Sequence, residues 1–563
     1  MKNIYLSLLI AVSFAFSACS EFLEEDNRSN LVASEYYQKT ESYNALVNAC
    51  YSTLRDVFGG RCEMFCAGTD IFIMGNRIFS QGLGNYRGLT PTDVSVEDFY
   101  VTMYEAIKVC NDGIHYGELY NHDAKLIAEV RFLRAMYYFH LVQQFGNVAL
   151  IVENSETPIM AYSFSEAKDV YAFIIDEMKA VLEADLPLTT SDGRVSKRAI
   201  NHFLAKVYLT RSYETYAESS DAANAISCAT TAINGQKLTL DYETEVFWPG
   251  KEKNDEILFA VQISAATMPS NVEGGSMQYD FFGPYMGGTD ASVGMTYGGP
   301  HQNNALIPSF QLHRWLAEDA NDKRYAATFM QELYGPLTGT KVDYFAYFAL
   351  TPEQRKDLQV KIYYPKISAT QTDVDNWVAV NPEKRANTPI WWAGDEPDKY
   401  FYRSDWESGN EDLCAPAIKK FSDPKATYKD GARTSTRDIF LARLAETYLI
   451  RAEASIKKDG AGSSSAAADI NEVRTRAGAV NIAASAAAVD FILAERAREL
   501  AGEYHRWYDL KRTGKLVEYV TKYNKQVTDA DMKGTGGAYK ILRPIPAQAI
   551  ELSTNRPAQN LGY

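Results

Sequence analysis

Two stretches of the sequence concentrate aromatic side chains beside polar ones. The longer stretch, residues 376–406, holds these large rings: Trp377, Trp391, Trp392, Tyr400, Tyr402 and Trp406. The shorter stretch mixes rings with hydrogen-bonding groups: Asp70, Asn76, Arg77, Phe79 and Tyr86. Aromatic faces stack on the CH faces of sugar rings, while Asp, Asn and Arg side chains bond to hydroxyl groups. Both stretches are therefore predicted to bind a hydroxyl-rich ligand.

The strongest single candidate is the adjacent pair Trp391 and Trp392, which lies in a loop flanked by Pro and Gly. Residues 279–285 contribute a further aromatic segment. The complete set of predicted ligand-binding residues is Trp391, Trp392, Trp377, Tyr285, Asp70, Arg77 and Tyr86. The sequence leaves a second interpretation open, in which these side chains belong to the core or contact a protein partner.

No pattern in the sequence indicates catalysis. The seven histidines show neither HExxH nor any other metal-ligand spacing. Ser165 and Lys168 match S-x-x-K without a companion Lys-Thr-Gly, so a serine that begins a helix is the better interpretation. In the same place, Ser163 and Glu166 are expected to form a capping box. With 72 acidic residues some glycosidase-like carboxylate pair always looks plausible, so the sequence neither supports nor excludes a glycosidase. We predict a protein that is not an enzyme, with no catalytic residue, metal site or cofactor; whether calcium assists stays open.

The first residues are typical of an exported lipoprotein. Lys2 supplies a positive charge, residues 4–16 are apolar, and Ser17-Ala18 precede Cys19. The apolar run is too short to span a bilayer as a stable helix. We therefore predict a signal peptide over residues 1–18 and lipid attachment at Cys19. An ordinary signal peptide followed by an incidental cysteine is the alternative.

Charge and cysteine content narrow the choice of partners and cross-links. The net charge of −15 disfavours nucleic acid, because phosphate binding needs clustered Lys and Arg. Six cysteines follow Cys19, and we expect them to be scattered, mostly buried thiols. A local disulfide between Cys62 and Cys66 stays open.

Pairs of amphipathic helices recur along the chain. In three predicted helices a small residue precedes a tyrosine by three positions: Ala135/Tyr138, Ala205/Tyr208 and Ala445/Tyr448. Another amphipathic segment follows each, and residues 41–58 and 96–116 form a looser pair. Small side chains let helices approach and the tyrosine fills the neighbouring groove, which is typical of tetratricopeptide (TPR) repeats.

Residues 236–436 separate the third pair from the fourth and differ in composition. They are rich in Gly, Pro, Trp and Tyr and include the β-like run Ile257–Ile263. Long irregular loops in a compact protein are usually functional, and so many aromatic residues disfavour disorder. The predicted fold is mainly α, a TPR-like helical-repeat scaffold of about four helix pairs with a loop-rich, partly β insertion.

Residues 495–512, ERARELAGEYHRWYDLKR, are predicted to form one helix that docks through an apolar stripe. Its charged residues are expected to form a solvated face with weak pairs of about 0.2–0.5 kcal/mol each. Gly502 inside this helix costs about 1 kcal/mol relative to Ala, which suggests that another segment packs closely there.

Several segments, taken in order, resemble landmarks of the SusD/RagB family of outer-membrane nutrient-binding lipoproteins. They are CSEFLEED, VRFLRAMYYFHLVQQFGNVAL, DIFLARLAETYLIRAEA, ERAREL with RWYDLKR, and the closing ILRPIPAQAIELSTNRPAQNLGY. The closing segment departs from the family pattern at Leu561, where proline is common. The combination covers nearly the whole chain.

The resemblance implies how the chain is divided and where it acts. It implies a SusD-like N-terminal region over residues 19–235 with helix pairs one to three, and a SusD/RagB C-terminal region over residues 236–563. The latter comprises the ligand-binding insertion, 236–436, and the fourth pair with the final helix, 437–563. It further implies that acylated Cys19 holds the protein in the outer membrane, facing outwards, beside a SusC-like TonB-dependent transporter.

Three functional hypotheses follow. The first is a non-catalytic surface lipoprotein that binds oligosaccharide or polysaccharide and delivers it to the transporter. The second keeps this role with peptide as cargo. The third is a TPR scaffold that binds only protein partners.

Overall fold

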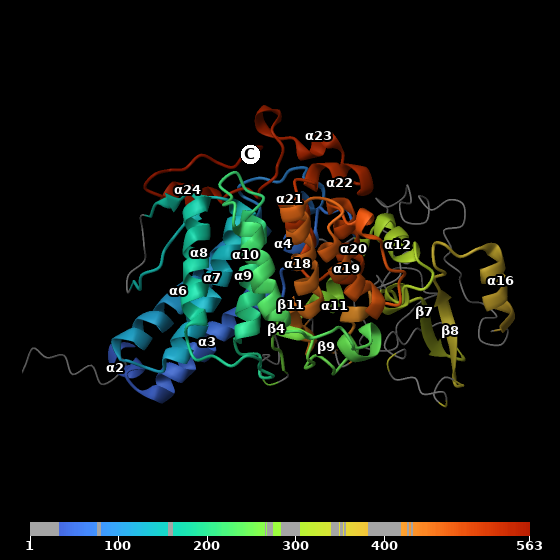
Figure 1. Ribbon diagram of the computed structural model, residues 1–563, viewed down its shortest axis with the longest axis horizontal. Helices are drawn as coiled ribbons and strands as arrows, with labels where there is room; N and C mark the ends of the chain where they lie inside the picture. Colours follow the sequence, from blue (N-terminus) through green and yellow to red (C-terminus); the bar gives the residue numbers. More distant parts are fainter. Residues whose placement is uncertain are drawn as a thin grey trace, which may run out of the picture.

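The computed structural model describes residues 33–75, 80–155, 162–264, 274–282, 305–338, 356–380, 418–424, 427–429 and 432–563, with the single residues 266, 348 and 353. Helical repeats fill the left and centre of the molecule, and the insertion extends to the right (Figure 1). Within these ranges no helix has the length and apolar character needed to cross a bilayer.

Four antiparallel helix pairs form the scaffold, as predicted. They are α3 (Thr40–Phe58) with α6 (Val94–Leu119), α7 (Ala124–Phe145) with α8 (Ala167–Leu182), α9 (Lys197–Arg211) with α10 (Asp221–Ile233), and α18 (Leu444–Asp459) with α19 (Ser464–Arg476). Side chains cap three of these helices by accepting from the backbone N–H three residues on: Asp93 for α6, Ser196 for α9 and Ser463 for α19. Because α10 packs on α18, the fourth pair continues the stack across the insertion.

Small residues bring the first pair together. A Cβ atom on Gly113 would lie 3.2 Å from the Cys50 sulfur, and one on Gly117 would lie 2.3 Å from the Tyr43 hydroxyl. The Tyr43 hydroxyl instead donates to the Gly113 carbonyl at 3.1 Å. In the first pair, small residues of α6 therefore face a tyrosine of α3, the kind of packing that the sequence pattern predicts.

The insertion is built from short strands and helices. Its first strand, β4 (Ile257–Val261), lies within the predicted β run Ile257–Ile263 and pairs antiparallel with β11 (Ile439–Arg443), which leads into α18. The other strands are β5 (Gly274–Gly275), β6 (Leu306–Pro308), β7 (Glu332–Pro336), β8 (Leu358–Tyr363), β9 (Thr427–Lys429) and β10 (Ala432–Ser435). The helices are η1 (Tyr242–Val246), α11 (Gln278–Phe281), α12 (Phe310–Ala317), α13 (Arg324–Thr328), α16 (Gln371–Val380) and η5 (Lys419–Phe421).

Short elements complete the two ends of the chain. In the first half they are α2 (Ala33–Tyr37), α4 (Cys62–Cys66), β1 (Phe72–Met74), α5 (Gln81–Asn85), β2 (Val148–Ala149) and β3 (Phe164–Ser165). In the last part they are η6 (Ala484–Ala486), α20 (Val489–Leu500), α21 (Arg506–Arg512), α22 (Leu516–Tyr523), α23 (Asp529–Met532), η7 (Thr535–Gly537) and α24 (Ala547–Leu552). The final segments run across the top of the helical scaffold (Figure 1).

The prediction of one continuous helix over residues 495–512 was wrong. The chain forms α20 and α21, and between them Gly502 and Tyr504 have positive φ angles of 79° and 66°. Left-handed backbone ends a helix, and glycine adopts it without steric cost. The predicted close packing is real, since a Cβ on Gly502 would lie 2.5 Å from the Phe421 ring.

The prediction of a solvated charged face was also wrong, because the charged residues from Glu495 to Asp509 are buried and paired. Glu499 binds Arg324 of α13, Arg443 of β11 and Arg476 of α19 at 3.1, 2.7 and 2.5 Å. Burial disfavours the charged carboxylate, yet the three guanidinium groups hold the pKa of Glu499 well below its usual value.

Two further carboxylates extend this network. Glu495 binds Arg324 at 2.7 Å and Arg474 at 2.9 Å. Glu503 binds Lys420 at 2.8 Å and Arg443 at 3.0 Å. The network therefore links the final helices to both the insertion and the fourth helix pair.

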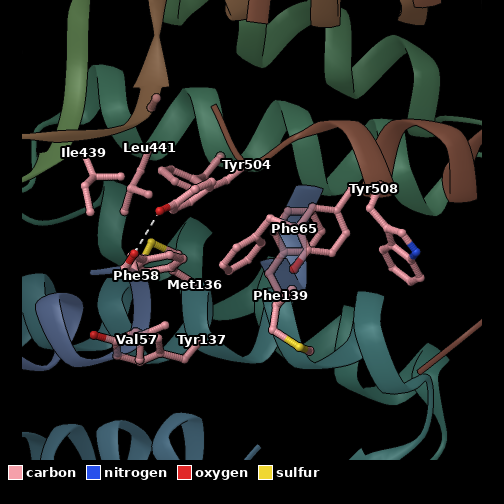
Figure 2. Close-up of a cluster of buried hydrophobic side chains, with 14 of the residues drawn as sticks. Val57, Phe58, Phe65, Met136, Tyr137, Phe139, Ile439, Leu441, Tyr504 and Tyr508 are labelled. Carbon is pink, nitrogen blue, oxygen red and sulfur yellow. Dashed lines mark hydrogen bonds between the residues drawn. The ribbon is translucent and has the colours of Figure 1, made fainter. Parts of the chain in front are cut away.

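One part of the main apolar core lies where α3, α4 and α7 meet the turn between α20 and α21 (Figure 2). There the Tyr504 ring stacks on Phe65, with centroids 4.7 Å apart, and its hydroxyl donates to the Phe58 carbonyl at 3.1 Å. His140 packs against Phe58 and Phe65 and bonds to the Tyr508 hydroxyl at 3.0 Å. His140 is therefore a core residue.

Two smaller expectations have different outcomes. The capping box of Ser163 and Glu166 is absent: α8 begins after Glu166 without a side-chain cap, and Ser163 bonds to Thr554. Ser165 belongs to β3 and does not begin a helix.

Five cysteines are free thiols and four of them are buried, as expected: Cys50, Cys62, Cys66, Cys110 and Cys228. Cys414 lies outside the described residues.

Replacing Gly502 by alanine tests the turn between α20 and α21. We expect Gly502→Ala to lower the free energy of unfolding by about 2–4 kcal/mol, because it adds backbone strain and a clash with Phe421. Gly514→Ala is the matched control, since Gly514 has a φ of 69° but open space around it. It should cost only the strain, about 1 kcal/mol. Urea unfolding followed by circular dichroism measures both; equal losses would contradict close packing at Gly502.

Candidate ligand-binding site

The predicted binding stretch from Asp70 to Tyr86 contains one strand of a two-stranded ribbon. Strand β1 pairs antiparallel with β6, and the Gly75 N–H donates to the Ala305 carbonyl at 3.0 Å. The chain continues from Gly75 to Arg77, and it reaches Ala305 from the segment that follows Tyr285. Arg77 and Tyr285 lie outside the described residues, as do Trp391, Trp392 and Cys19.

Asp70 anchors the base of this ribbon inside the protein. Its carboxylate is fully buried and accepts two bonds from Arg506 of α21, at 2.7 and 2.5 Å. The Ser309 hydroxyl, just after β6, donates to the Asp70 carbonyl at 2.6 Å. In this structure Asp70 therefore fixes the segment that leads into β1, and its side chain does not reach solvent.

Side chains from the C-terminal part hold the same segment by its backbone. Asn524 donates to the carbonyl groups of Thr69 and Phe72, at 2.9 and 3.3 Å. Gln526 binds both the N–H and the C=O of Met74, at 2.7 and 3.0 Å, as a paired strand would. The sequence offered no signal for these contacts, because the partners are about 450 positions apart.

Tyr86 is also buried. Its hydroxyl donates to the Gly68 carbonyl at 2.8 Å, and the Arg543 guanidinium lies 5.9 Å from its ring centre. Lys540 donates to the Tyr86 carbonyl at 2.5 Å. The Tyr86 ring is enclosed between Gly68 and the C-terminal residues Lys540 and Arg543. Like Asp70, it is therefore not accessible to a ligand in this structure.

Trp377 has the properties expected of a stacking platform. It projects from α16, is partly exposed, and stacks on Tyr363 of β8 with ring centres 4.0 Å apart and an interplanar angle of 8°. Its indole N–H donates to Glu332 of β7 at 2.7 Å. The same carboxylate accepts from Tyr334.

The ring pair connects α16 to the β7–β8 hairpin, two parts of the insertion at the far right of the molecule (Figure 1). Burial, then the charge of Glu332, raises the pKa of Tyr363 to about 12. Sequence reasoning missed Tyr334, Tyr363 and Glu332. The alternation of residues 358–363 was the available signal for a strand with one exposed face.

A polar cleft of about 680 Å³ lies elsewhere, between residues 187–198 and the segment 252–262. None of the predicted ligand residues lines it, and its Phe259 ring is buried in the core. Burial raises the pKa of the Asp438 carboxyl at its edge to about 6. We favour the Trp377 platform for a sugar, because the cleft offers no exposed aromatic face.

Among the described residues, no three His, Cys, Asp or Glu side chains come together as a metal site. His202 lies between Thr447 and Glu446, at 2.7 and 3.1 Å. His313 stacks on Phe329. Both imidazoles are fully buried, and burial lowers their pKa values, so they serve the packing of the core.

Two family models match this chain, one in each half. The model described as "Starch-binding associating with outer membrane" matches residues 21–209, and the model described as "SusD family" matches residues 404–563. The chain belongs to the SusD/RagB family. The segments that suggested this family from the sequence lie almost wholly inside the two matched ranges.

Relatives match nearly the whole chain, in sequence or in fold. The SusD-like protein P25 of Formosa agariphila is 24% identical, and the match covers 100% of both chains. The structure of a SusD homolog from Bacteroides thetaiotaomicron covers 95% of this chain and 100% of that one, at 19% identity and a TM-score of 0.68. Surface glycan-binding protein A of the same species, solved in complex with laminarihexaose, covers 93% and 99% at 19% identity and a TM-score of 0.63. The predicted helical-repeat scaffold with its insertion is thus confirmed.

The ion pair under the β1–β6 ribbon of this SusD/RagB protein can be tested by Asp70→Asn. The change leaves the Arg506 charge buried without its partner, so we expect a loss of about 3–5 kcal/mol in the free energy of unfolding. Asp98→Asn is the control: its carboxylate, bound to Arg61, is 58% exposed and should matter by less than about 1 kcal/mol. Unchanged stability with lost ligand affinity would instead make Asp70 a ligand residue.

Proposed function

We propose that this protein is a non-catalytic, surface-exposed lipoprotein that binds oligosaccharide or polysaccharide and delivers it to a SusC-like TonB-dependent transporter for nutrient uptake. Family membership supports this role. The family model for the N-terminal half carries the words "starch-binding" and "outer membrane", and a relative of the same fold was solved with a laminarin oligosaccharide. No cofactor enters the proposal.

The observation that carries the proposal is the fixed, partly exposed ring pair of Trp377 and Tyr363. A sugar ring needs a flat apolar face and nearby hydrogen-bonding groups, and the pair has both, since the Glu332 carboxylate lies at its edge. Preorganisation reduces the entropy lost on binding, because Glu332 already holds the indole ring in place.

We keep the remaining predicted residues, Trp391, Trp392, Arg77 and Tyr285, as ligand-binding candidates in the proposal. They lie outside the described residues. Asp70 and Tyr86 are excluded from direct contact in the proposal, since their side chains bond within the protein.

The Trp377 platform can be tested directly. We expect Trp377→Ala to weaken binding to the preferred glycan by about 1–2 kcal/mol, or about five- to thirtyfold, and Trp377→Phe to retain most of the affinity. Tyr36→Ala is the control, because Tyr36 is 36% exposed on α2 and distant from the insertion. A glycan array identifies the ligand, and isothermal titration gives the affinities. Binding to peptides and to no glycan would contradict the proposal, and unchanged affinity in Trp377→Ala would remove this platform.

The anchor is tested by Cys19→Ala. Each buried acyl CH₂ contributes about 0.8 kcal/mol, so several chains on one cysteine hold a soluble domain firmly at a membrane. We expect the wild type to fractionate with outer membranes and to incorporate labelled palmitate, and Cys19→Ala to do neither. Protease added to intact cells reports whether the wild type faces outwards. An unlabelled wild type that remains inside the cell would contradict surface anchoring.

A further inference from the structure

An apolar groove of about 300 Å³ opens on the outside of the first helix pair, away from the insertion. One wall is the N-terminal half of α6, and the opposite wall is α24 near the end of the chain. Ile151 and Tyr162 complete the lining. The groove is therefore formed by two parts of the chain, residues 97–162 and 546–552. Neither part contributes to the proposed glycan site.

Large aliphatic side chains remain exposed along this groove. Val101 on α6 is 44% exposed and Leu552 on α24 is 39% exposed. Val94, which is 77% exposed, precedes Val101 by seven residues and so lies on the same face of α6. Contiguous apolar surface of this kind on a folded protein marks an interaction site.

Two of the three tyrosines that line the groove, Tyr104 and Tyr162, have hydroxyl groups already bonded to backbone carbonyls. The Tyr104 hydroxyl donates to the Ala149 carbonyl, and the Tyr162 hydroxyl donates to the Ala549 carbonyl, each at 2.8 Å. Because both hydroxyl groups are already bonded to backbone, the rings offer the groove mainly their apolar faces. An occupant is therefore recognised by apolar contact inside the groove.

The rim adds a charge preference. Glu97 and Glu105 lie on the groove, and within the described residues neither carboxylate forms an ion pair. Lys108, the basic residue beside them, is bound to Asp112 at 2.9 Å. The rim is therefore acidic, which repels both anionic lipid and a second copy of this chain, whose net charge is −15.

We propose that this groove is a docking site for a protein segment that carries one or two large apolar side chains flanked by Lys or Arg. The apolar side chains fill the groove, and the basic residues pair with Glu97 and Glu105. The inference rests on the proposed function for the identity of the partner: an extracellular segment of the SusC-like transporter.

The test uses the full, acylated protein in its native membrane. Val101→Asp places a charge in the groove, and Leu119→Asp is the matched control, because Leu119 is 52% exposed near the other end of the same helix. We expect Val101→Asp to lower co-purification of the transporter at least about tenfold and Leu119→Asp to leave it unchanged. Thermal unfolding of both variants confirms that they fold.

A photo-crosslinking amino acid at position 101 or 119 gives an independent measurement. We expect position 101 to crosslink to a transporter segment with apolar and basic residues, and position 119 to give no such product. A transporter complex that survives Val101→Asp, or crosslinks from position 101 only to lipid or to a second copy, overturns the groove assignment and leaves the proposed function intact. A wild type that forms no transporter complex overturns both.

Discussion

The structure depends on burying the carboxylates of α20 together with all their cationic partners. Removing a charge from water costs several kcal/mol unless the ion is paired and hydrogen-bonded. Glu499 meets this condition only when α13, β11 and α19 each deliver an arginine. A second centre of the same kind lies beside it, where Glu446 receives Lys206 of α9 and Arg496 of α20. The two centres make the insertion, the third helix pair and the fourth helix pair interdependent.

The helix pairs could be predicted because their signals are local. A small residue, a tyrosine three positions later and a second amphipathic segment specify a packed pair without knowledge of distant partners, as Ala205 and Tyr208 illustrate. The charges of residues 495–509 could not be interpreted in the same way. Pairs such as Glu495 and Arg498 fit a solvated helix surface equally well, and only the long-range partners Arg324 and Arg474 show that the carboxylate is enclosed.

The candidate site could also be predicted only in part, because its side-chain partners are distant in the sequence. Composition identified the aromatic segments, and Trp377 lies partly exposed within one of them. It could not reveal which way each side chain turns. Asp70 and Tyr86 have residue types suited to a ligand, yet Arg506 and the Gly68 carbonyl are their partners. Conversely, Glu332 orients the indole of Trp377 from a separate strand, and no spacing in the sequence links the two.

The contacts by which C-terminal side chains hold the segment around β1 also constrain the order in which the molecule assembles. Arg506 is separated from Asp70 by 436 positions, and Lys540 is separated from Tyr86 by 454. Contacts between residues so far apart in the sequence form late, because the intervening chain must first be synthesised and collapsed. Asp70 and Tyr86 therefore lack these contacts on a nascent chain until its last sixty or so residues have emerged.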